Sequence, residues 1–379
     1  MTAGRRRPLR VALTIGVQAT GGVRRQALEL AAWMLQRDEV ELVPIGSEAN
    51  LAALAELAGV APGRSVVVPT TQGALEVLWT RYALDRRLAR EQVDVLHCVK
   101  TMAPRRSRVP VVLTVNDFLV VDRPQDFTRA KAMFLPRLFL RSVRGADHWI
   151  AIADSVAADA QSRLGIPSQA ITTIYPGASA LTDTPPEVVE GVPPRYALAV
   201  GDLSPRKNVA FLARLWADVH EATGLHLIAA GPEGWRSEEA QRSLVGLERA
   251  GIGRWVGRVS DGELRWLYEH ASVVCVPSIA EGYGIAVVEG VAFGRPVVAS
   301  DVPSLQEAAA GSVVSVALTD PDRWVEAIAA AARTDPPPPV VTQSWADAAA
   351  QTLEVYERVV GRARGRTTTA DRARHAPSA

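Results

Sequence analysis

The chain has 379 residues, enough for about two or three domains, each with its own hydrophobic core. Its 42 basic and 41 acidic residues leave a net charge of +1, so no overall field favours nucleic acid or an anionic membrane. No apolar run reaches transmembrane length, and Arg10 interrupts the signal-like N-terminus. Cys98 and Cys275 lie in separate apolar runs, which indicates buried, reduced thiols in a cytoplasmic protein.

The first predicted unit is a strand over Arg10–Val17, a turn at Gly21-Gly22 and a helix over Gln26–Gln36. Further strand-like runs separated by helix-like segments follow at Val40–Ile45, Ser65–Val68, Val93–Cys98, Val109–Val115 and His148–Ala153. This alternation predicts an α/β fold with a doubly wound parallel sheet and ligands at the carboxyl ends of the strands. The turn glycines fit a ligand loop, but they serve any α/β protein equally well. His97, at one strand end, is more often a structural residue than a catalyst.

A basic amphipathic helix is predicted over Thr128–Val143, with arginines beside large apolar residues. Such a helix can lie on a membrane. Because Pro136 would kink it, we favour a solvated basic face above a stripe packed on the core. Membrane contact stays the alternative.

The segment Ala178–Arg195 holds four prolines and no periodicity, so we place a linker there. A second domain opens with the strand Tyr196–Val200, followed by Gly201. Ser204 and Pro205 are typical of an N-cap and a first helical residue. Arg206 and Lys207 would then lie in the first helical turn, where their charge opposes the helix dipole unless they hold an anion.

A strand at Ser272–Pro277, a turn and a small-residue helix over Ile285–Phe293 form a second phosphate-type unit, which Gly294 ends. Its turn is Glu281-Gly282-Tyr283-Gly284. In a continuous helix Glu281 and Glu289 would lie ~12 Å apart along the axis, which suits the two ends of one extended ligand. Two solvated glutamates on an ordinary βαβ unit are the alternative.

The last predicted helix, residues 341–362, follows a Pro336–Pro339 breaker. One stripe of it is apolar: Trp345, Ala349, Leu353, Tyr356 and Val360. Residues 363–379 are polar and rich in Arg and Thr, which predicts a disordered tail.

Glu281-x7-Glu289, followed by Gly294–Ser300, resembles the donor-site signature of the family 4 GT-B glycosyltransferases, and residues 201–208 resemble the family's diphosphate-binding element. The family comprises retaining enzymes that use nucleotide sugars. The resemblance implies two Rossmann-like domains, 1–177 on the acceptor side and 196–340 on the donor side, facing a cleft. Residues 178–195 would link them, and the helix 341–362 would cross back to the first domain.

The resemblance also implies roles for residues. Arg206 and Lys207 would neutralise the leaving diphosphate, Glu281 would hold the sugar hydroxyls, and Asn116 would stand beside the sugar. Family members often carry a His-Asp pair where this chain has Asn116-Asp117, and Asn cannot titrate. Glu289 would hold the ribose, and the implied donor-binding set is Gly21, Gly22, Gly201, Gly282, Tyr283, Gly284, Ile285 and Glu289.

No cofactor and no metal are expected, because the Asp320-Pro321-Asp322 run is explained as a helix start. The expected partners are a nucleotide-sugar donor and a sugar, lipid-linked or small-molecule acceptor, without nucleic acid. Two alternatives remain open: a glycoside phosphorylase or epimerase on the same fold, and a non-catalytic sugar-nucleotide-binding protein.

Overall fold

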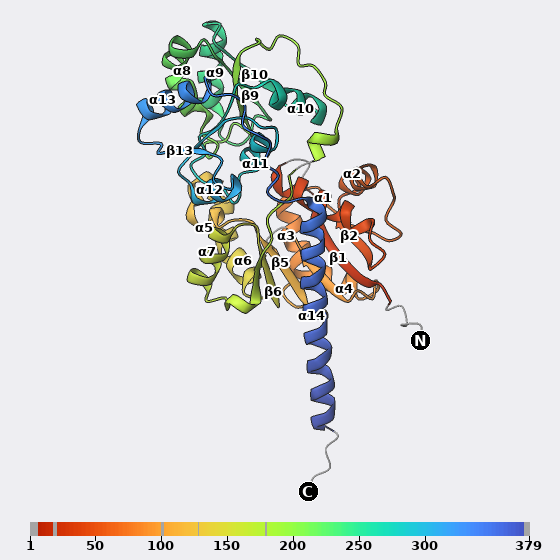
Figure 1. The fold of residues 1–379 in the computed structure, drawn as a ribbon. Coiled ribbons are helices and arrows are strands. Elements are labelled where there is room, and N and C mark those ends of the chain that lie inside the picture. The colour runs from red at the N-terminus through yellow and green to blue at the C-terminus, as the bar shows by residue number, and fades with distance from the viewer. Residues whose placement is uncertain (1–6, 18–20, 100–101, 128, 179, 375–379) are drawn as a thin grey trace. The chain divides into compact units, whose positions relative to one another are not determined.

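The computed structural model describes residues 7–17, 21–99, 102–127, 129–178 and 180–374 (Figure 1). The chain forms two compact units. Unit 1 comprises residues 1–176 and 345–379, and unit 2 comprises residues 177–344.

Unit 1 is built on a seven-stranded parallel sheet in the order β3-β2-β1-β4-β5-β6-β7. Its strands are β1 (Leu9–Gly16), β2 (Val40–Gly46), β3 (Val66–Val67), β4 (Val95–Cys98), β5 (Val111–Val115), β6 (His148–Ala151) and β7 (Ile171–Thr173). Its helices are α1 (Gly22–Leu35), α2 (Glu48–Ala58), α3 (Gly73–Tyr82), α4 (Leu84–Leu88), α5 (Leu119–Asp122), α6 (Arg129–Val143), α7 (Asp154–Leu164) and α14 (Trp345–Arg374). Successive strands are added on one side of β1 up to β3 and on its other side from β4 onward, so the strand order reverses between β1 and β4. This confirms the doubly wound fold that the alternation predicted.

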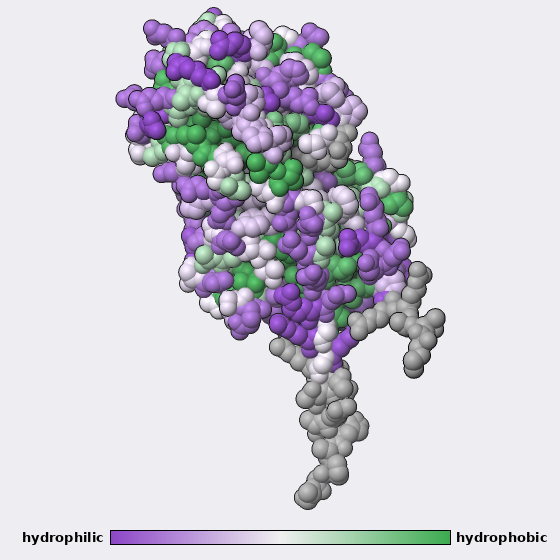
Figure 2. Space-filling model, viewed as in Figure 1, coloured by the Kyte–Doolittle hydropathy of each residue, from purple (hydrophilic) through white to green (hydrophobic). Residues whose placement is uncertain are grey.

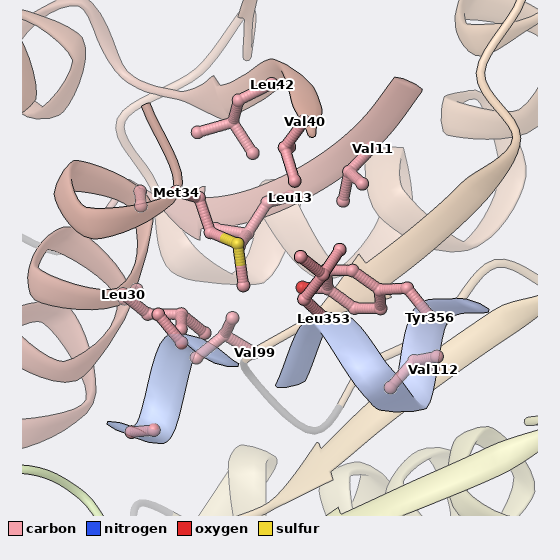
Figure 3. Close-up of a cluster of buried hydrophobic side chains, with 14 of the residues drawn as sticks. Val11, Leu13, Leu30, Met34, Val40, Leu42, Val99, Val112, Leu353 and Tyr356 are labelled. Atoms are coloured by element: carbon pink, nitrogen blue, oxygen red, sulfur yellow. The ribbon is translucent and has the colours of Figure 1, made fainter. Parts of the chain in front are cut away.

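Helix α14 returns to unit 1 and completes its core. In Figure 3, Leu353 and Tyr356 of this helix lie among side chains of the sheet and of α1, including Leu13 and Met34. All five residues of the predicted stripe, from Trp345 to Val360, are buried. Hydrophilic side chains gather over the other side of the helix in Figure 2. The amphipathic pattern thus places α14 against unit 1.

The helix is longer than predicted. It continues to Arg374, through residues expected to be disordered, and residues 375–379 lie outside the described part of the chain. Alanine and arginine favour helix, and residues 362–374 contain no proline. A helix that is already nucleated by packing extends at little cost through such a segment.

His97 joins β4 to α14. Its Nδ1 lies 2.6 Å from the Tyr356 hydroxyl and its Nε2 lies 2.7 Å from Thr114 Oγ1. Complete burial lowers the pKa of His97 to about 3, so the ring is neutral at pH 7. The geometry agrees with the structural interpretation of this histidine.

Unit 2 has a six-stranded parallel sheet in the order β10-β9-β8-β11-β12-β13. Its strands are β8 (Tyr196–Val200), β9 (His226–Ala230), β10 (Gly253–Gly257), β11 (Val273–Val276), β12 (Val297–Ser300) and β13 (Val314–Val316). Its helices are α8 (Val209–Thr223), α9 (Glu238–Arg249), α10 (Asp261–His270), α11 (Ile285–Ala292), α12 (Pro303–Ala308) and α13 (Pro321–Ala331). The core centres on two fully buried indoles, Trp216 and Trp324, and Phe211 packs edge-on against Trp324 at 5.5 Å.

The proline-rich segment 178–195 belongs to unit 2 and packs along α10. Arg265 donates to the carbonyls of Thr182 and Thr184, both at 2.7 Å. Ser260, the N-cap of α10, donates to Glu187 at 2.7 Å. A short 3-10 helix, Ala180–Asp183, lies in this segment, and side chains of α10 fix the irregular backbone that follows it.

Both cysteines are buried free thiols, as predicted, and burial raises the pKa of Cys98 to about 12. Among the described residues, none of the helices combines the length and the apolar character that a membrane span requires.

Candidate functional site

The residues that the sequence singled out in unit 2 lie close together at the point where the strand order of the sheet reverses. Strands β8 and β11 are parallel neighbours, and the chain leaves them toward opposite edges of the sheet. The loops after them, residues 201–208 and 277–284, therefore lie at the same carboxyl edge. Such a switch point is where open α/β sheets bind ligands.

The predicted helix start at Ser204-Pro205 is wrong, because α8 begins at Val209. Asp202 accepts hydrogen bonds from the backbone N–H and the hydroxyl of Ser204, which closes a separate turn. The turn ends at Asn208, whose left-handed backbone (φ 56°) interrupts any helix. Arg206 and Lys207 thus lie in a turn before the helix and not in its first turn. A side chain compensates their positive charge.

That side chain is Glu281. Arg206 Nη1 donates to Glu281 Oε2 at 2.7 Å, and Lys207 Nζ donates to Glu281 Oε1 at 2.7 Å. Ser278 adds a third hydrogen bond to Oε1 at 2.8 Å. Arg206 also donates to the carbonyl of Ala280 at 3.1 Å. The two cations and one carboxylate form a cluster of net charge +1.

The carboxylate of Glu281 is ionised. Its side chain is only 8 % exposed, and this burial by itself would raise its pKa. The charges of Lys207 and Arg206 and the bonds from Lys207 and Ser278 outweigh it, and they lower the pKa of Glu281 to about 2.

Backbone contacts bring the two loops together. The N–H of Ile279 donates to the carbonyl of Arg206 at 2.8 Å, and the hydroxyl of Ser304 donates to the carbonyl of Glu281 at 2.8 Å. Gly201 has φ 143°, and a Cβ on it would approach Lys207 Cε to 3.0 Å. Only glycine fits there without displacing the lysine.

Helix α11 begins directly after this cluster, at Ile285, as predicted. Its N-cap is Gly284 (φ 103°), where a Cβ would lie 2.4 Å from Leu305 Cδ2. Gly282 lies in the bend before it, and Tyr283 is buried. The N-terminus of α11 therefore faces the same edge as the cations, and its dipole adds positive potential.

Glu289 lies within α11, apart from the three-residue cluster. Its carboxylate is buried, and the Tyr268 hydroxyl donates to its Oε2 at 2.8 Å. Tyr268 is stacked on Phe293 with 5.5 Å between ring centres. Sequence reasoning missed Ser278 and Tyr268, since neither is distinguished by a motif and their partners are set by the fold.

In unit 1, the predicted residues follow β1 and β5, at the carboxyl edge of the parallel sheet. Gly21 (φ 100°) is the N-cap of α1 and Gly22 its first residue. Asn116 follows β5 and is buried. Its Nδ2 donates to the carbonyl of Val99 at 2.9 Å, and its Oδ1 accepts no hydrogen bond from the described residues. A buried acceptor of this kind is suited to receive a hydroxyl.

Asp320 is the N-cap of α13, as predicted. Its carboxylate accepts the N–H of Arg323 at 3.0 Å, and Pro321 follows as the first helical residue. The helix start accounts for this acidic pair.

Each half of the chain matches a known family. Residues 20–180 match Glycosyltransferase Family 4, and residues 194–334 match Glycosyl transferases group 1.

Two curated relatives are named as mannosyltransferases. The chain is 27 % identical to the O-antigen chain mannosyltransferase RfbU of Salmonella typhimurium over 57 % of this chain and 59 % of that protein. It is 28 % identical to the phosphatidyl-myo-inositol mannosyltransferase of Mycobacterium leprae over 89 % of this chain and 93 % of that protein. The chain thus spans less than two thirds of the Salmonella relative.

A solved structure shows the same fold. Anabaena Alr3699/HepE, in complex with UDP and glucose, has a TM-score of 0.63 at 16 % identity, covering 96 % of this chain and 100 % of that one. With a matching glycosyltransferase family on each Rossmann-like unit, the chain belongs to the GT-B glycosyltransferases and resembles family 4.

Proposed function

We propose that the protein transfers a hexosyl group, mannosyl by analogy with its relatives, from a nucleotide sugar to a hydroxyl acceptor. The transfer retains the anomeric configuration and needs no metal. The observation that carries the proposal is the cluster of Arg206 and Lys207 held by Glu281 at the switch point of unit 2. A diphosphate is the ligand whose charge suits two fixed cations beside a helix N-terminus.

The cluster acts by electrostatic preorganisation. Glu281 fixes the guanidinium and the ammonium before the donor arrives, so little reorganisation is needed when the sugar–phosphate bond breaks. The negative charge that grows on the leaving diphosphate then meets cations already in position. Glu281 accepts hydrogen bonds from three protein side chains. We therefore assign it two roles: it holds this cluster together, and it binds the sugar hydroxyls.

Glu289 is assigned to the ribose of the donor. Its Gln variant should raise the donor KM by about tenfold with little change in kcat, because a ribose contact contributes equally to the ground and transition states. Steady-state kinetics over a range of donor concentrations measure both constants. Tyr268→Phe, which removes only the hydroxyl that holds Glu289, is the matched control and should raise KM less. A fall in kcat without a change in KM would place Glu289 at the reacting sugar instead.

Asn116 is assigned to positioning, through its buried Oδ1. Asn116→His should change the rate modestly and introduce a pH dependence near the ordinary histidine pKa of ~6.5, because only histidine titrates in this range. The measurement is kcat between pH 5 and pH 8 for both proteins. If the natural protein shows no turnover and the histidine variant gains strong activity, the protein is a non-catalytic binder.

The whole proposal is tested with a panel of nucleotide sugars and hydroxyl acceptors. Donor binding is read first by thermal shift, since a ligand at ~100 times its Kd adds about 2.7 kcal/mol of stability. Turnover is then measured in excess EDTA, and NMR identifies the anomer of the product. We expect full activity with EDTA and a retained configuration. Loss of activity with EDTA or an inverted product would contradict the mechanism, and phosphorolysis or epimerisation without transfer would contradict the activity.

A further inference from the structure

Side chains from other parts of unit 2 hold the backbone of the loop that carries Glu281. This loop, residues 277–284, belongs to neither a helix nor a strand, so no regular ladder of backbone hydrogen bonds fixes its path. Four of its carbonyl groups instead accept a hydrogen bond from a side chain. The pairs are Pro277 with Asn208 at 3.2 Å, Ser278 with Ser300, Ala280 with Arg206 at 3.1 Å, and Glu281 with Ser304 at 2.8 Å.

Two of these donors, Ser300 and Ser304, are buried serines. Ser300 is the last residue of β12 and is 0 % exposed, and Ser304 is the second residue of α12 and is 3 % exposed. Strands β11 and β12 are parallel neighbours, so Ser300 lies beside the start of the loop. Because a polar group shielded from water needs its hydrogen-bond partner, each hydroxyl favours one conformation of the loop.

The two hydroxyls support Glu281 by different routes. Ser300 donates to the carbonyl of Ser278, and the hydroxyl of Ser278 donates to Glu281 Oε1 at 2.8 Å. Ser304 donates to the backbone carbonyl of Glu281 itself. One serine thus supports the carboxylate, and the other supports the main chain from which it extends. Together they set the position from which Glu281 holds its two cations.

Helix α12 also supports the other end of the same turn. Leu305, next to Ser304, is fully buried, and a Cβ on Gly284 would lie 2.4 Å from its Cδ2. Since Gly284 is the N-cap of α11, adjacent residues of α12 contact the turn both at Glu281 and where α11 begins. Helix α12 therefore fixes the backbone of Glu281 relative to the N-terminus of α11.

We infer that Ser300 and Ser304 are positioning residues for the cluster of Arg206, Lys207 and Glu281. They act through the loop backbone, and they keep the carboxylate, and with it the two cations, in place before the donor binds. A misplacement of about 1 Å can lower a rate about a hundredfold, so the loss of such a support should reduce turnover. The inference rests on the proposed function, in which the cations meet the leaving diphosphate.

Ser300→Ala and Ser304→Ala should each lower kcat about tenfold, whereas the donor KM should change less than about threefold. A displaced cluster stabilises the leaving group poorly, and most of that stabilisation develops in the transition state. Steady-state kinetics are measured with the nucleotide sugar that the natural protein turns over, chosen from UDP, GDP, ADP and TDP sugars. Each variant is assayed below its melting temperature, so that only folded protein is compared.

Ser304→Cys is the conservative variant, and its thiol is a weaker hydrogen-bond donor. Its kcat should lie between those of the natural protein and of Ser304→Ala. Thr352→Val is the matched control, because it also removes a buried hydroxyl, which donates to the carbonyl of Ala348 at 2.7 Å within α14. It should keep the natural kcat even if it melts at a lower temperature. A natural kcat in both alanine variants would overturn the inference, since the two serines would then be structural only.

A readout without catalysis separates the inference from the proposed function. The carboxyl signal of Glu281 in carbon NMR, assigned by comparison with Glu281→Gln, should shift in both alanine variants and stay unchanged in Thr352→Val. If the natural protein transfers no sugar but this signal shifts as expected, the proposed function fails and the two serines still position the cluster. An unshifted signal in the alanine variants would overturn the inference, whatever the natural protein transfers.

Discussion

Arg206→Ala should lower kcat by about two orders of magnitude, because a preorganised charge-assisted contact to a leaving group contributes about 3 kcal/mol to transition-state stabilisation. The donor KM should change less, since the contact strengthens as charge develops on the diphosphate. Single-turnover kinetics with saturating donor measure the effect on the chemical step.

The control for this variant is Arg214→Ala, which removes an exposed arginine of α8 paired with Glu239 at 2.8 Å. It should retain the kcat of the natural protein, because an exposed pair contributes little. In a first helical turn the charge of Arg206 would oppose the helix dipole, and its removal would leave stability unchanged or improve it. Because Arg206 lies in a turn and donates to Glu281 and to the carbonyl of Ala280, we expect Arg206→Ala to lower stability instead. Near-normal turnover in Arg206→Ala would show that Arg206 does not stabilise the leaving group.

Glu281→Gln should lower the stability of unit 2 at pH 7 by about 3 kcal/mol, because it leaves the two partly buried cations, Arg206 and Lys207, without the carboxylate that pairs with them. The effect should depend on pH. The pKa of Glu281 is lowered to about 2 in the folded protein, so its charge stabilises the fold above its unfolded pKa. This stabilisation is lost as the pH falls from ~5 toward 2, where the natural carboxyl also becomes protonated.

The measurement is the melting temperature of the natural protein and of Glu281→Gln between pH 7 and pH 3. The difference in melting temperature between the two proteins should be largest at pH 7 and should decrease as the pH falls. Glu239→Gln, in the exposed pair with Arg214, is the control and should melt like the natural protein at both ends of the range. A gap that is constant with pH would mean that Glu281 is not held in its charged form by these cations.

Much of the fold was predictable because it depends on local patterns. The apolar run Tyr196–Val200 predicted a strand at its observed bounds, and the stripe from Trp345 to Val360 predicted the buried side of α14. Glycine at Gly284 and Gly294 marked the start and end of α11, because both positions have positive φ.

The contacts within the site were not predictable to the same degree, because they join residues far apart in sequence. The pairing of Lys207 with Glu281 spans 74 residues and depends on β8 and β11 being neighbours. The start of α8 was mistaken because Ser204 and Pro205 satisfy the local rules, whereas Asn208 and its bond to the carbonyl of Pro277 decide the outcome. Tertiary contacts overrode local preference at the position closest to the proposed chemistry.

The return of α14 to unit 1 has a consequence for biosynthesis. The ribosome synthesises residues 1–176 before unit 2, yet the side chains that close their core, Leu353 and Tyr356 among them, are added only after unit 2. Until then Leu13, Met34 and their neighbours lack part of their apolar cover. Unit 2, continuous from residue 177 to 344, has its whole core available earlier. We therefore expect the second half of the chain to mature first, and the N-terminal half to need chaperone protection in the meantime.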